Sequence, residues 1–391
     1  MATQPPALRH RDSAPAIPDE LSEEILLRLP PGDPSCLVRA SAVCKRWRRI
    51  VSQPNFLRRL HELHGTPPPL LGFFHSDYSK RFAARVDYGP STKFVPTTPS
   101  AFSLSIPNSR KWYALNYRHG RLLFCSKVTQ EGQDFLVWEP ITGHQRILPV
   151  PGAPKNYVMD AAVVCAADGC DHRDCQGGPF RLVLVYLVEN VDSLFVRAYS
   201  TETGSWGDMS TVTYEPIREK SSILVGKSLY FFSIFDRMVK YDLTGQSGLS
   251  VINLPEPEVL ADCRGVTGLV LTRERELGVA GVMETRLYLW SSTAGDKGEL
   301  QSENCRVIEL HNMLPAAALS ASERVDVVGF AEDANVIFLK TIAGVSAINL
   351  DSEPARKVYQ TSETYETLTA FSSFYIPGKR VASAGGGEGM P

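Results

Sequence analysis

Apolar residues recur every three or four positions between residues 17 and 64, as they do along one face of an amphipathic helix. Leu21, Ile25 and Leu29 mark the first such face. Asp33-Pro34 then signals a new helix start, because aspartate caps helices and proline fits their first position. Further apolar stripes follow with the same spacing. We therefore predict a three-helix domain over residues 17–64, with one more short helix at its end.

From residue 71 to about residue 378 the pattern changes to short β-branched and aromatic runs separated by glycine and polar turns. The clearest unit spans residues 111–151 and predicts four strands, as in one blade of a β-propeller. Its segment 137–143 recurs in weaker form around four later residues: Tyr199, Tyr241, Trp290 and Asn349. A single four-stranded sheet cannot bury both of its faces, whereas copies stacked around an axis can. We predict a propeller of five to seven blades, with a β-sandwich pair or a linear β array as the open alternatives.

Three segments lie outside these two domains. Residues 65–70 are rich in proline, which is typical of a stiff linker. Residues 1–16 and 379–391 hold too little apolar sequence for a core and are predicted to be a disordered leader and tail. The predicted fold class is thus α+β as separate domains, helical first and all-β second.

The composition is that of a soluble globular protein, with 391 residues, 43% hydrophobic residues and a net charge of −2. This charge argues against bulk attraction to nucleic acid or anionic membrane. No run approaches the roughly 20 apolar residues of a membrane span, and residues 1–16 lack the apolar core of a signal peptide. We therefore expect the chain in the cytoplasm, the nucleus or both, with its eight cysteines as reduced thiols.

The order of features in residues 17–56 resembles the F-box. An Ile17-Pro18 opening precedes a leucine-rich first helix, a break with proline and aspartate, and the block Val43-Cys44-Lys45-Arg46-Trp47. The departures are Ile17, where leucine is usual, and the extra proline Pro34. With the β-rich region that follows, the chain resembles plant F-box proteins that carry a C-terminal, F-box-associated kelch-like propeller.

This resemblance implies a substrate-recognition subunit of an SCF-type (Skp–cullin–F-box) ubiquitin ligase. The F-box would bind a Skp-family adaptor and through it a cullin, and the β domain would bind a target protein that the sequence does not identify. A helical module of about 40 residues is too small to bury all its leucines, so a partner can cover those left at its surface. The residues expected to contact the adaptor or to support that contact are Ile17, Pro18, Leu21, Ile25, Leu26, Leu29, Leu37, Val38, Val43, Cys44, Trp47 and Ile50.

A nucleic-acid-binding helical module fused to a β-propeller interaction scaffold is the alternative. Seven basic residues and no acidic residue fall within 22 positions: Arg39, Lys45, Arg46, Arg48, Arg49, Arg58 and Arg59. Helix–turn–helix proteins use basic helices of this kind. However, the overall charge is not basic. In addition, the helix around Trp47 has an apolar face, formed by Val43, Trp47, Ile50 and Val51, where a DNA-reading helix would need polar residues. We therefore prefer the adaptor hypothesis.

One cluster has the chemistry of a metal site. Cys165, Cys170, His172 and Cys175 follow the order C-x4-C-x-H-x2-C, and thiolate and imidazole are good zinc ligands. The spacing matches no standard zinc pattern, and Cys165 ends an apolar strand. We therefore predict no metal and no other cofactor, and keep these four residues as candidates only. A phosphate-binding glycine loop, a nucleophile elbow and paired zinc histidines are all absent from the sequence, so we expect a non-catalytic adaptor.

Overall fold

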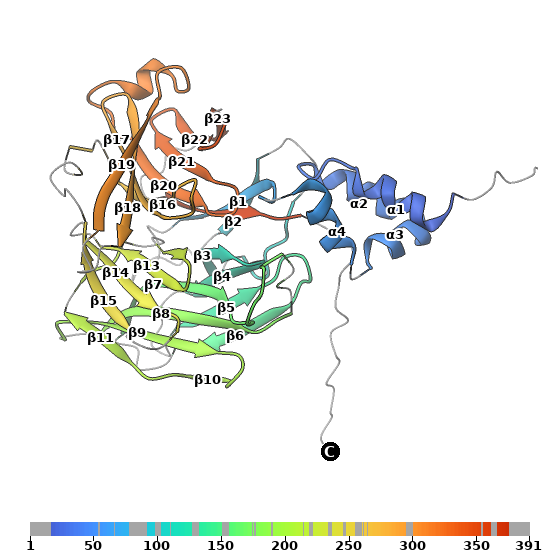
Figure 1. Ribbon diagram of the computed structural model, residues 1–391, viewed down its shortest axis with the longest axis horizontal. Coiled ribbons are helices and arrows are strands. Elements are labelled where there is room, and N and C mark those ends of the chain that lie inside the picture. Colours follow the sequence, from blue (N-terminus) through green and yellow to red (C-terminus); the bar gives the residue numbers. More distant parts are fainter. Residues whose placement is uncertain are drawn as a thin grey trace, which may run out of the picture.

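The computed structural model describes most of residues 17–374. The gaps are residues 54, 66, 78–91, 98–102, 110, 127–132, 151–155, 174, 176, 189–190, 214, 219–221, 234–236, 245–247, 255–259, 261, 264, 295–299, 353–354 and 361–365. The predicted leader and tail lie outside the described residues. Figure 1 shows a helical domain attached to one side of a larger all-β domain.

Four helices form the helical domain. They are α1 (Asp19–Leu27), α2 (Pro34–Val43), α3 (Lys45–Val51) and α4 (Phe56–His64). The first three cover the predicted three-helix motif, and α4 is the additional short helix. The Asp33 side chain caps α2 by accepting a hydrogen bond from the Ser35 amide at 3.1 Å, and Cys44 separates α2 from α3 in an extended conformation. The sequence signal for the start of α2 is therefore confirmed, whereas Leu29, which was expected on the face of the first helix, lies beyond the end of α1.

The strands of the described residues form six sheets arranged as blades (Figure 1). The first blade is β3 (Trp112–Arg118), β4 (Arg121–Ser126), β5 (Asp134–Trp138) and β6 (Gln145–Pro149). The second is β7 (Asn156–Cys165), β8 (Phe180–Val188), β9 (Ser193–Ser200), β10 (Ser205–Trp206) and β11 (Ser210–Thr213). The third is β12 (Ile223–Val225), β13 (Ser228–Phe232), β14 (Arg237–Asp242) and β15 (Leu249–Asn253).

Two further blades also follow chain order. The fourth is β16 (Gly268–Leu271), β17 (Leu277–Met283), β18 (Arg286–Ala294) and β19 (Leu300–Glu309). A short 3-10 helix, η2 (Ala316–Leu319), leads to the fifth, which is β20 (Asp326–Ala331), β21 (Val336–Thr341), β22 (Gly344–Asn349) and β23 (Ala355–Tyr359). Together with a sixth blade, which is described below, these sheets confirm the propeller prediction, and the described strands form six blades.

The repeated motif marks the same position in each of these five blades. Its aromatic or polar reference residue lies in the third strand every time: Trp138 in β5, Tyr199 in β9, Tyr241 in β14, Trp290 in β18 and Asn349 in β22. The uneven spacing between them comes from loops of different length. The repeat in the sequence is therefore a repeat of one strand position.

The sixth blade combines both ends of the β domain. β1 (Leu70–Asp77) pairs with β2 (Thr92–Pro96) on one side and with β24 (Glu366–Ser372) on the other. Phe73 lies opposite Ala370, nearly 300 positions along the chain. Because its strands are so far apart in the sequence, this blade shows no local repeat. The pairing closes the ring and removes two sheet edges that would otherwise stay open.

Apolar side chains fill the space between neighbouring blades. Phe135 of the first blade and Leu182 of the second belong to one buried cluster, and Val270 of the fourth blade packs in a cluster with Ile337 of the fifth. Each blade is thus buried by its neighbours, as the argument from burial predicts. Among the described residues, no helix has the length and apolar character that a membrane crossing requires.

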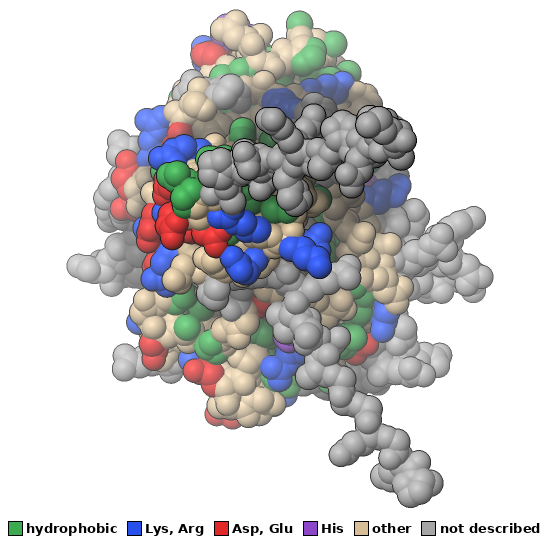
Figure 2. All heavy atoms as spheres, turned by 90° about the vertical axis from the view of Figure 1, so that its right-hand side faces the viewer, with side chains coloured by type: hydrophobic (Ala, Val, Ile, Leu, Met, Phe, Trp, Pro, Cys, Tyr) green, Lys and Arg blue, Asp and Glu red, His purple; other side chains and the backbone are tan. Residues whose placement is uncertain are grey.

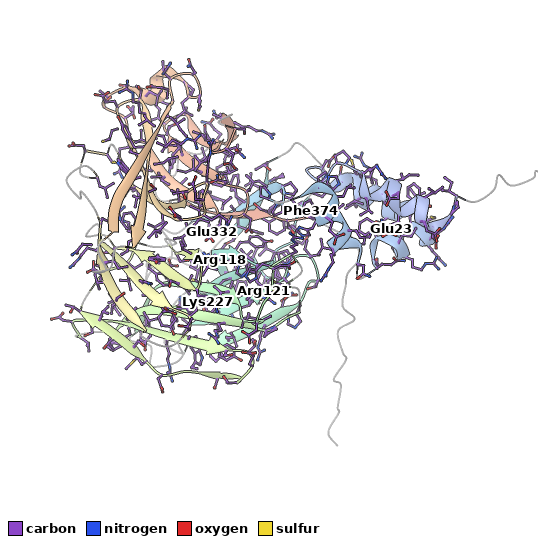
Figure 3. All side chains as sticks on the ribbon, viewed as in Figure 1. Glu23, Arg118, Arg121, Lys227, Glu332 and Phe374 are labelled. Atoms are coloured by element: carbon purple, nitrogen blue, oxygen red, sulfur yellow. The ribbon has the colours of Figure 1, made fainter. Side chains whose placement is uncertain are left out.

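The two domains share part of a core. Phe374, directly after β24, is 2% exposed and packs in the cluster of Leu26, Ile50 and Leu60 of the helical domain. Its ring lies 4.4 Å from the ring of His61 in an edge-on arrangement, and Figure 3 shows Phe374 at the junction of the domains. Nearby, the Ser373 amide donates a hydrogen bond of 3.1 Å to the carbonyl of Pro69 in the linker. The helical domain therefore obtains one core residue from the far end of the β domain.

Candidate functional site

Seven of the twelve predicted F-box site residues are exposed. Among their large apolar side chains, Leu21 and Val43 have the highest exposed fractions, 56% and 67%. The seven are Ile17, Pro18, Leu21, Ile25, Val38, Val43 and Cys44. Leu21 and Ile25 lie one turn apart on α1, so they share one face of that helix. Several large apolar side chains that are exposed on one small domain offer a surface that a partner protein can cover.

The other five predicted residues lie deeper. Leu26, Leu37 and Ile50 are buried in the shared core, and Leu29 and Trp47 are half-buried against it. The first three shape the bundle and present no surface to a partner. Sequence reasoning also missed Leu63, which is 47% exposed at the end of α4. A helical plot could not have found it, because the 3.6-residue period places Leu63 on the same face as the buried Phe56 and Leu60.

The basic residues of the helical domain are largely paired with acids. Asp19 receives hydrogen bonds from Arg46 and, at 2.8 Å, from Arg49, and Arg59 lies 2.7 Å from Glu23. The hydrogen bond from Arg46 holds the pKa of Asp19 below its usual range. Figure 2, which views the molecule from the side of the helical domain, shows acidic and basic side chains next to one another. The basic run is therefore neutralised in large part within the domain itself, which disfavours the nucleic-acid alternative.

A cavity of about 520 Å³ lies between the two domains. Leu57 and His61 of α4 line one side, and His119, Arg275 and Asp333 of the propeller line the other. Burial raises the pKa of Asp333 to about 6, and the neighbouring Glu332 adds to that shift. The cavity lining therefore combines cationic, anionic and neutral groups, including the adjacent carboxylates of Glu332 and Asp333 and the thiol of Cys175.

Arg118 connects three blades at the centre of the propeller. Its guanidinium bonds Glu332, with Nε 3.0 Å from Oε2, and donates to the carbonyl of Ser222 at 3.3 Å. The Arg118 side chain is 2% exposed and that of Glu332 is 15% exposed, and Figure 3 shows the two close together. This buried ion pair links alternate blades across the centre of the ring, and removing one partner would leave a buried charge unpaired.

The four metal-ligand candidates meet in the loop between β7 and β8. Their ligand atoms all lie within 4.8 Å of one another. Cys170 Sγ and His172 Nδ1 are each 3.4 Å from Cys175 Sγ. Burial lowers the pKa of His119, which stacks on His172 with ring centroids 3.8 Å apart, to about 2. Against the expectation from spacing, the fold brings all four ligands together, because Gly169, His172 and Gly177 adopt positive φ angles that turn the loop back on itself.

Comparisons with known proteins agree with this architecture. The F-box domain model matches residues 15–59, and the model described as "F-box protein AT5G49610-like, beta-propeller" matches residues 114–375, more than half of the chain. A relative from Arabidopsis thaliana, named as an F-box protein (At3g16210), is 23% identical over 219 residues, 56% of this chain and 54% of the relative. The chain thus spans about half the length of that curated relative.

Solved structures give weaker likenesses. AztD from Citrobacter koseri is 13% identical, with 74% of this chain and 80% of that chain covered and a TM-score of 0.34. The β-propeller domain of Cps50 (Swd1) from Myceliophteria thermophila is 11% identical, with 66% and 77% covered and a TM-score of 0.37. Nothing is concluded from scores this low. On the two sequence-family matches, the chain belongs to the F-box proteins that carry an AT5G49610-like β-propeller.

Proposed function

We propose that this chain is the substrate-recognition subunit of an SCF-type ubiquitin ligase. Its F-box would bind a Skp-family adaptor, which links to a cullin, and its propeller would bind a target protein. Proximity to the conjugating enzyme would then raise the effective concentration of target lysines, so no residue of this chain need perform chemistry. The kelch-like repeat type and a location in the cytoplasm or nucleus belong to the same proposal.

The observation that carries the proposal is the exposed apolar surface of an F-box domain. Leu21 and Ile25 are 56% and 48% exposed on one face of α1, within the residues that match the F-box model. Full burial of an exposed Leu or Ile side chain stabilises by roughly 1.5–3 kcal/mol, so burial of the exposed half of each contributes about half of that. Exposed apolar side chains on one helix face can act as anchors against a partner helix.

The test is co-purification of the full-length chain with a Skp-family adaptor. The full chain is required because Phe374 supplies part of the helical core. We expect the double variant Leu21→Asp and Ile25→Asp to abolish capture, because two carboxylates would have to be desolvated at the interface. The matched control is Ile147→Asp, since Ile147 is 57% exposed on β6 of the propeller.

The control variant should bind the adaptor as well as the unmodified chain does. If the unmodified chain fails to capture any adaptor, the ligase hypothesis is wrong. If it instead binds DNA with an affinity that falls steeply with salt, the nucleic-acid alternative replaces it.

A further inference from the structure

We propose that Cys165, Cys170, His172 and Cys175 bind one structural zinc ion. The inference does not depend on the proposed ligase function, because it concerns the stability of a propeller loop. The three thiols and the imidazole come from a stretch of 11 residues, and their ligand atoms all lie within 4.8 Å of one another. Three cysteines and one histidine form a closed ligand set that zinc uses in structural sites.

The separations fit a tetrahedral ion. Zinc–sulfur bonds of about 2.3 Å give about 3.8 Å between sulfurs at two corners of a tetrahedron, and slightly less between sulfur and nitrogen. The observed Cys170–Cys175 and His172–Cys175 separations are both 3.4 Å. A disulfide would require about 2.05 Å between its sulfurs, so the cluster has the dimensions of a metal site and not those of a covalent pair.

Backbone geometry prepares the ligands. The His172 amide donates a hydrogen bond to Cys170 Sγ at 3.4 Å, a contact that stabilises a thiolate more than a thiol. The Cys165 amide donates to His119 Nδ1 at 3.0 Å, while the His119 ring stacks on His172. His119 thereby holds the backbone at Cys165 and orients the imidazole ring of His172. Residues that surround a metal's ligands commonly orient those ligands in this way.

A buried ion pair from the first blade holds the remaining part of the loop. Arg121 of β4, labelled in Figure 3, donates to the carbonyl of Cys175 and, at 2.7 Å, to that of Gly178. Its Nε lies 3.3 Å from Glu139 Oε1, and Glu139 accepts from the Gly177 amide at 3.0 Å. Zinc with three thiolates carries one net negative charge, and the guanidinium of Arg121, which is shared with Glu139, donates to the backbone on the Cys175 side of the loop.

A zinc ion at this site would also shape the cavity between the domains. His172 and Cys175 line that cavity together with His61 of α4. The ion would join the end of β7 to the start of β8 and so hold this part of the cavity wall in one shape. Without it, three neighbouring thiols and a ring would have to be kept together by weak hydrogen bonds alone.

The test is the zinc content of the purified full-length chain, measured by plasma mass spectrometry. We expect one zinc ion per chain. His172→Ala should weaken zinc binding by more than about 100-fold, since altering groups one shell further out already costs 10–100-fold. Because His172 is exposed, this variant should still fold. Its control is His144→Ala, also an exposed histidine in a turn, which should keep its zinc.

A second measurement covers the case in which cysteine variants fail to fold. The unmodified chain is stripped with a chelator and titrated with Co²⁺, which should give the absorption bands of a tetrahedral cobalt–thiolate site. Cys170→Ser should lose them, and Cys305→Ser, at an exposed thiol of β19, should keep them. The proposal is overturned if the unmodified chain holds no zinc and takes up no cobalt, or if mass analysis finds a disulfide between two of the three cysteines.

Discussion

The described ion pairs of the helical domain are partly or largely exposed, whereas the propeller also contains buried ion pairs. In the helical domain the Arg46–Asp19 pair leaves 33% and 41% of its side chains exposed. In the propeller the Arg118–Glu332 pair leaves 2% and 15%, and Arg121–Glu139 leaves 1% and 5%. Exposed pairs contribute little because water screens them, whereas breaking a buried pair leaves a charge without its partner.

This difference agrees with the proposed function, in which the helical domain binds an adaptor and the propeller holds a rigid ring that binds a target. A surface that docks on a common adaptor can vary its outer charges at little cost, provided that Leu21 and Ile25 stay apolar. A ring of six blades must hold its blades around one centre, and Arg118 of the first blade reaches across that centre to the third and fifth blades. Three changes test the comparison, from the largest expected effect to the smallest.

Arg118→Met should destabilise the propeller by about 3–5 kcal/mol, because Glu332 would keep a nearly buried carboxylate without its cation. Urea unfolding followed by circular dichroism measures this loss. The same substitution at an exposed pair, Arg49→Met, is the matched control, and it should leave the unfolding midpoint unchanged. Equal effects at the two positions would contradict the contrast between the domains.

Phe374→Ala should destabilise the helical domain by about 3 kcal/mol, because it removes a buried aromatic ring from that domain's core. Hydrogen exchange of the α4 amides, measured by mass spectrometry, should accelerate while exchange in β4 stays slow. The control is Leu63→Ala on the same helix, since Leu63 is 47% exposed. Unchanged exchange in α4 would show that the helical domain is stable without the propeller's contribution.

Asp333→Asn should stabilise the chain at neutral pH by up to about 3 kcal/mol. The native pKa of Asp333, about 6, exceeds its usual value of 3.8 because burial disfavours the charged form. The native state therefore binds more protons than the unfolded state between about pH 4 and pH 6, and this group's contribution to stability is lost as the pH rises through that window. The gain of the variant over the unmodified chain should accordingly be small at pH 4 and largest at pH 7. A gain that does not vary with pH would contradict the assigned shift.

Local patterns predicted the elements well. Residues 111–151 hold the four predicted strands as β3 to β6, and the repeated motif lies in the third strand of five blades. Such features depend on residues that are neighbours in the chain, so periodicity and turn residues reveal them. The same reasoning left the blade count open, because the sixth blade has no contiguous sequence.

The candidate sites divide in the same way. Ile25 and Leu26 are adjacent and both apolar, yet one is 48% exposed and the other buried, since the 3.6-residue period directs them to different faces. The sequence identified the Cys/His cluster but its spacing argued against a metal. It could not show that positive φ angles in the loop and the Arg121–Glu139 pair of another blade would bring the ligands together.

By itself, the sequence determined that a leucine-rich helical motif precedes a β-domain built from a repeated strand pattern, because both features follow from spacing within a few residues. Only the tertiary structure decided how the ring closes, how the helical core is completed and where the four ligands meet. Each of these depends on contacts between distant segments, as when Phe73 pairs with Ala370 or Phe374 packs against His61. Such contacts form only when the whole chain buries its apolar surface together, and no local pattern records them.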